Sequence, residues 1–72
     1  MIYEIIKEIK NECGNNQMRD VFFSEEEIAD PDQWIRLTEP FAETIERVDH
    51  EHGMKYLVFA HGLNTEYTLT RV

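Results

Sequence analysis

The clearest hydrophobic pattern lies in the last third of the chain, where apolar and polar residues alternate on both sides of Gly62. Taking Gly62-Leu63 as a two-residue turn predicts a β-hairpin in which Val58 pairs with Tyr67. In the same register Tyr56 pairs with Leu69. One face of this hairpin then carries Tyr56, Val58, Ala60, Tyr67 and Leu69. The other face is mixed, so we expect it to be only partly covered: Lys55, Leu57, Phe59, Glu66, Thr68 and Thr70.

The segment from Ile2 to Cys13 fits two patterns. A helix would align its isoleucines on one face and stop at Gly14. A strand suits the β-branched residues, and "GNN" is typical of a turn. We favour the strand, because the following segment, which ends in Val21, Phe22 and Phe23, is short and needs an antiparallel neighbour. The two segments together predict an N-terminal hairpin.

Two helix-start signals follow this hairpin. Ser24 stands three residues before Glu27, and Asp30 precedes Pro31 as an N-cap precedes the first helical residue. We therefore expect a helix from Pro31 that stops before Pro40. Trp34, Ile35 and Leu37 are the apolar residues that this helix would turn toward a sheet.

The stretch from Phe41 to His52 is open between a helix and a strand. Thr44, Ile45 and Val48 are β-branched, which favours a strand, although Ile45 and Val48 then fall on opposite faces. Such a strand would turn at His52-Gly53 and complete a meander with the final hairpin. The expected fold is a single α+β domain over residues 1–72: a small antiparallel sheet of four to five strands with one main central helix packed on a face.

Charge is concentrated in the middle of the chain. The net charge is −8, and a chain of 72 residues can bury only a small core. From Asp20 to Glu51 there are eleven acids and two arginines, which sum to −9, whereas the remainder sums to +1. Such a field repels nucleic acid and anionic membranes and attracts basic proteins. We expect no direct nucleic-acid binding, no membrane association, no signal peptide and a basic protein partner.

The residues that could carry chemistry do not form a known constellation. His50 and His52 flank Glu51, but the predicted turn leaves His61 too distant to complete a metal site, and Lys55 would oppose a cation. Ser24 suits a helix cap better than a nucleophile, and Cys13 is the one cysteine. The sequence therefore predicts a non-enzymatic protein without metal or cofactor. A lone thiol also suits a reducing, cytoplasmic compartment.

The acidic segment contains a small apolar group, Trp34, Ile35 and Phe41, that could anchor a contact inside a charged rim. Our hypothesis is an interaction protein that binds, and by analogy inhibits, a partner through a basic surface of the nucleic-acid-binding type. We expect the partner-binding residues to be Glu25, Glu26, Glu27, Asp30, Asp32, Trp34, Glu39, Glu43 and Glu46.

Two other functions stay open at this point. The first is a small-molecule-binding protein with a pocket lined by Trp34, Tyr56 and Tyr67, closed at a dimer interface. The second is a structural accessory subunit of a larger complex. A homodimer also suits the sequence, since pairing could cover Leu57 and Phe59 or extend a strand edge.

Overall fold

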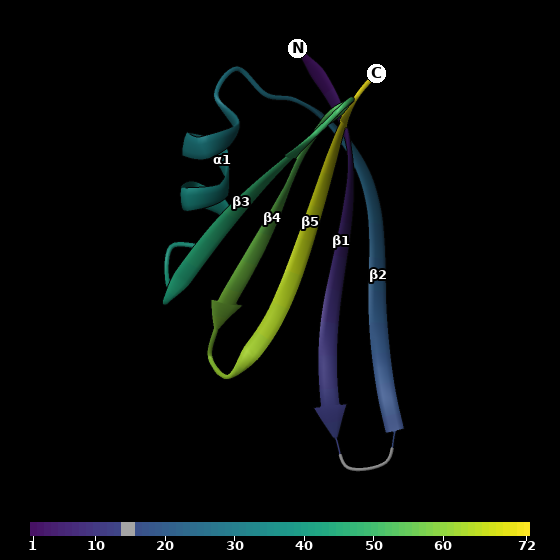
Figure 1. Ribbon diagram of the computed structural model, residues 1–72, viewed down its shortest axis with the longest axis vertical. Coiled ribbons are helices and arrows are strands. Elements are labelled where there is room, and N and C mark those ends of the chain that lie inside the picture. The colour runs from purple at the N-terminus through teal and green to yellow at the C-terminus, as the bar shows by residue number, and fades with distance from the viewer. Residues whose placement is uncertain (14–15) are drawn as a thin grey trace.

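In the part of the chain that the structure describes, five strands form one antiparallel sheet, accompanied by one short helix (Figure 1). The computed structural model describes residues 1–13 and 16–72, with side chains for residues 1–10 and 20–72. The elements in chain order are β1 (Ile2–Cys13), β2 (Asn16–Glu27), α1 (Pro31–Thr38), β3 (Thr44–His50), β4 (Gly53–Ala60) and β5 (Leu63–Arg71). The strand order across the sheet is β2-β1-β5-β4-β3. The prediction of an α+β fold with an antiparallel sheet is confirmed, with strand content dominant.

Both ambiguous segments are strands. β1 pairs with β2 as an N-terminal hairpin, and β3, β4 and β5 form a meander. The two units are joined by β1 and β5, whose ladder runs from the Tyr3–Arg71 pair to the Lys10–Asn64 pair. The predicted turn residues Gly14 and Asn15 lie outside the described residues.

One face of the sheet holds the core. The pairing registers place on this side the buried strand residues of the central cluster, which are Tyr3, Ile5, Met54, Tyr56, Val58, Tyr67 and Leu69. We call this side the tyrosine face and the opposite side the second face. The described side chains of the second face are half-buried or exposed, and Gly53 is the buried residue among the described positions of that face. The faces predicted for the C-terminal hairpin are therefore confirmed.

The helix begins where the sequence predicts. Asp30 is the N-cap, its carboxylate accepts a hydrogen bond from the Gln33 N–H at 3.3 Å, and Pro31 is the first helical residue. The other start signal was wrong, because β2 continues through Ser24 to Glu27. Figure 1 shows the connection from β2 crossing the top of the molecule to α1, which lies at the β3 side.

One helical side chain, Ile35, joins the core cluster with only 1% of its surface exposed. Trp34 is half-buried, and its ring meets Tyr67 edge-on at a centroid distance of 5.8 Å. Leu37 remains 73% exposed, so the predicted turning of Leu37 toward the sheet was wrong. An eight-residue helix spans little more than two turns, and its anchoring depends on a few side chains.

The two turns predicted within the β3–β5 meander are each one residue away from the observed positions. The C-terminal hairpin turns at His61-Gly62, with Ala60 opposite Leu63, so Tyr56 pairs with Tyr67 and not with Leu69. His61 and Gly62 both have positive φ, 53° and 74°, which suits the twist of a two-residue hairpin turn and disfavours Leu63 there. β3 and β4 turn at Glu51-His52, with His50 opposite Gly53.

Gly53 is buried in β4 for a reason other than a turn. A Cβ atom at this position would overlap the carbonyl oxygen of Leu69 in β5. The backbones of β4 and β5 therefore approach more closely here than any side chain allows. Gly62 differs, because a Cβ there would meet nothing within 4 Å.

We predict that Gly53→Ala lowers the free energy of unfolding by about 3 kcal/mol, since β5 must move to admit the methyl group. Gly62→Ala should cost about 1 kcal/mol, because only the left-handed backbone is strained. Urea unfolding followed by circular dichroism would measure both. Equal losses in the two variants would contradict the close approach at Gly53.

Candidate partner-binding face

The nine residues predicted to bind a partner do not come together in one place. Glu25, Glu26 and Glu27 lie on β2, at one edge of the sheet, and are exposed. Glu43 and Glu46 lie just before and within β3, at the opposite edge. Three strands separate the two groups, and the remaining four residues belong to the helix segment.

Two of the predicted partner-binding acids hold α1 to the sheet. The Tyr56 hydroxyl donates to Asp32 Oδ1 at 2.7 Å, and the Tyr67 hydroxyl donates to Glu39 Oε1. Arg47 Nη1 donates to the same Asp32 oxygen at 2.8 Å, and its Nε donates to Asp49. Asp32 and Glu39 therefore satisfy buried tyrosines, a structural task that the sequence pattern did not reveal.

The protonation states follow from this arrangement. The bonds from Tyr56 and Arg47 hold the pKa of Asp32 below its ordinary value of 3.8. Burial, and then the bond to the carboxylate, raises the pKa of each tyrosine well above its ordinary value. The tyrosine hydroxyls thus keep their protons and the carboxylate of Asp32 stays ionised over the physiological range.

The three expected apolar anchors differ in how far they are buried. Ile35 is in the core, so it cannot reach a partner, and Trp34 is half-buried against Tyr67. Phe41 is 73% exposed and meets His61 at a ring-centroid distance of 6.0 Å. Tyr56 and Tyr67, which were expected to line a pocket with Trp34, are almost fully buried, and their hydroxyls bind Asp32 and Glu39.

The second face, which the sequence predicted to be only partly covered, is a surface that the sequence analysis did not assign to a basic partner. Strand alternation places six acids on it against two lysines among the described side chains. The acids are Glu4, Glu8, Glu25, Glu27, Glu46 and Glu66, and the lysines are Lys10 and Lys55. Apolar residues lie between them, including exposed Val48 and half-buried Leu57 and Phe59. Three of the nine predicted residues, Glu25, Glu27 and Glu46, belong to this face.

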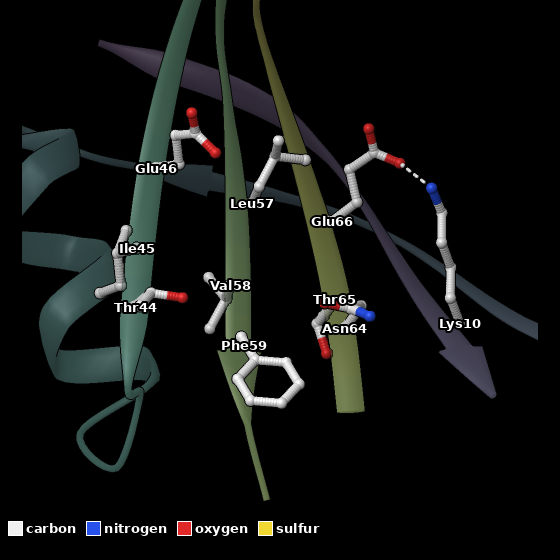
Figure 2. A pocket seen from close by; sticks show the side chains of 10 residues that line it. All are labelled: Lys10, Thr44, Ile45, Glu46, Leu57, Val58, Phe59, Asn64, Thr65 and Glu66. Atoms are coloured by element: carbon white, nitrogen blue, oxygen red, sulfur yellow. Dashed lines mark ion pairs between the residues drawn. The ribbon is translucent and has the colours of Figure 1, made fainter. Parts of the chain in front are cut away.

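A groove of about 550 Å³ opens on the second face over β3, β4 and β5 (Figure 2). Leu57 and Phe59 project from β4 at its centre, with Thr44 and Glu46 on the β3 side and Asn64 and Glu66 on the β5 side. Lys10 reaches in from β1. The groove therefore combines an apolar centre with carboxylates on both sides.

The two carboxylates differ in their pairing. The carboxylate of Glu66 forms ion pairs with Lys55 Nζ at 3.0 Å and with Lys10 Nζ at 3.2 Å. These lysines hold the pKa of Glu66 below its ordinary value of 4.5. Glu46 is exposed and forms no ion pair with any described residue. Glu46 is therefore the carboxylate of the groove that can receive a cation from outside.

In the described part of the chain, the structure does not bring together the other side chains that could carry chemistry. The structure gathers no group of three His, Cys, Asp or Glu side chains around a metal-sized position among those residues. His52 lies in the β3–β4 turn, and its backbone N–H donates to His50 Nδ1 at 3.3 Å, as in a side-chain-closed turn. The side chain of Cys13 lies outside the described residues. In the described chain, α1 is far too short and too polar to cross a bilayer.

Comparison of the chain with known protein families, with curated proteins and with solved structures finds no match. Its function has to be inferred from its own residues.

We predict that Tyr56→Phe lowers the free energy of unfolding by about 1 kcal/mol near neutral pH, because Asp32 loses a donor. The folded-state pKa of Asp32 is depressed, so its stabilising effect is present above the unfolded value and is lost as pH falls through the folded value. Below about pH 4 the native chain should therefore lose stability more steeply than the variant. Urea unfolding at several pH values tests this, and parallel curves would contradict it.

Proposed function

We propose that this protein is a non-enzymatic binding protein that docks its second face on a basic surface of another protein. In this proposal α1 serves as the cover of the tyrosine face, which leaves the second face for the partner. The observation that carries the proposal is the excess of acids over lysines on the second face, where Glu46, which forms no ion pair with any described residue, lies beside the groove at Leu57 and Phe59. A mixed apolar and acidic face fits a partner that presents both cations and apolar stems.

The groove suits an arginine or lysine side chain of the partner. The aliphatic stem of such a side chain would lie against Leu57 and Phe59, and its cationic end would meet Glu46. Arginine would gain most, because its planar guanidinium can bind a carboxylate with two hydrogen bonds and stack on Phe59. Surfaces rich in arginine are typical of proteins that bind nucleic acid, so a docked partner would be hindered in that activity.

The proposal can be tested with an arginine-rich peptide and a set of purified basic nucleic-acid-binding proteins at low and high salt. We expect binding that weakens as salt rises, and that weakens about tenfold in Glu46→Gln, which corresponds to about 1.4 kcal/mol. The matched control is Glu51→Gln, which removes the same charge from the exposed β3–β4 turn. This control should change the affinity much less.

Two results would count against the proposal. One is the absence of salt-sensitive binding to every probe. The other is an equal loss of affinity in Glu46→Gln and Glu51→Gln, which would mean that only the net charge matters. Addition of duplex DNA supplies a further arm, because a docked nucleic-acid-binding protein should be released by competing DNA.

A further inference from the structure

The two edges of the sheet differ in how well they are protected against pairing with a further strand. β3 is the shorter edge strand, with seven residues that include Glu46, Arg47 and Asp49. β2 is the longer one, with twelve residues, and its central segment Val21–Ser24 has no charged residue. Charged side chains normally discourage pairing at an edge, and long uncharged edges invite it. β2 is therefore the edge at which another strand can add.

The central segment of β2 exposes apolar side chains on both faces of the sheet. Phe23 is 71% exposed on the second face, beside Val21, and Phe22 is 54% exposed on the tyrosine face. A single docked surface could cover only one of these faces. An added strand covers both, provided that it also carries apolar residues on both faces. A second copy of β2 meets this requirement.

The backbone of β2 selects the possible registers. Just beyond β2, Ile28 N–H donates to the Met1 carbonyl at 2.9 Å, in continuation of the ladder with β1. By the alternation of an antiparallel ladder, even-numbered residues of β2 direct their backbone groups toward β1. The odd-numbered residues, including Val21 and Phe23, direct theirs outward. Two antiparallel copies of β2 must therefore pair so that opposite residues have the same parity.

The side-chain pairs that each register would form then favour one of these registers. With Phe22 on the two-fold axis, Val21 lies opposite Phe23 of the second copy, and Asp20 lies opposite Ser24. Glu25, Glu26 and Glu27 fall opposite positions 17–19, which hold no acid in the sequence. Moving the axis to Phe23 would set Asp20 against Glu26, and moving it to Val21 would set Asp20 against Phe22. The register centred on Phe22 matches apolar residues and keeps acids apart.

We propose that two copies of this chain pair through β2, antiparallel and centred on Phe22, to form one continuous ten-stranded sheet from two sheets of five. Each copy carries a net charge of −8, so the copies repel one another at long range. Salt screens that repulsion, and self-association should strengthen as salt rises. This dependence is opposite to that of the basic-partner contact, so either proposal can fail without the other.

Analytical ultracentrifugation of the full chain over a range of concentrations and salt measures the dimer. Phe23→Lys should weaken the dimer at least tenfold. Phe41→Lys is the matched control, because Phe41 is 73% exposed against 71% for Phe23 and lies outside β2. A native chain that stays monomeric at millimolar concentration and high salt would overturn the proposal. Equal weakening by both substitutions would also overturn it.

Cross-linking tests the register, with Cys13→Ser as the background. In the proposed pairing the two Phe22 residues form a pair that is not hydrogen bonded, with Cα atoms about 4.5 Å apart, a separation that a disulfide can span. Phe22→Cys should therefore form a covalent dimer under mild oxidation. Ser24→Cys is the control, since its two copies would lie about 13 Å apart along the strands. Equal cross-linking of the two variants would overturn the register, and so would cross-linking of Ser24→Cys alone.

Discussion

The structure depends on the contact between two buried tyrosines and two carboxylates of the helix segment. Tyr56 and Tyr67 are cross-strand partners at the centre of the tyrosine face, and each would bury a hydroxyl at a cost if the hydroxyl had no acceptor. Asp32 and Glu39, near the two ends of α1, supply the acceptors. An eight-residue helix has little stability of its own, so these bonds and the burial of Ile35 fix its place.

The bonds of the two tyrosines to Asp32 and Glu39 show that part of the chain's acidity has a structural role. The concentration of acids in the middle of the chain suggests one acidic binding surface, yet these carboxylates have several structural roles. Asp30 caps the helix, Asp32 and Glu39 accept tyrosine hydroxyls, and Glu27 pairs with the N-terminal amine at 2.8 Å. The alternation of the strands leaves Glu46, which has none of these roles, beside an apolar groove on the second face.

Much of the fold could be predicted from local patterns. Alternation gave the correct faces of β4 and β5, and Asp30-Pro31 marked the start of α1. The predicted turn positions were one residue off because the sequence does not show which structural role each glycine has. Gly62 provides a positive φ, whereas Gly53 makes room for the Leu69 carbonyl of a strand that is distant in sequence. The roles of Asp32 and Glu39 were also hidden, since their tyrosine partners lie 24 and 28 residues away.

The ladder between β1 and β5 has a consequence for how the chain reaches its native state. The β1–β2 hairpin and the β3–β5 meander each pair strands that are neighbours in sequence, so each can form quickly. Joining the two units pairs Tyr3 with Arg71, and nearly the whole described chain separates these two residues in sequence. The entropy of closing so long a loop opposes that step, and the core residues of both units become buried only when it is complete. Assembly of the two preformed halves should therefore set the folding rate.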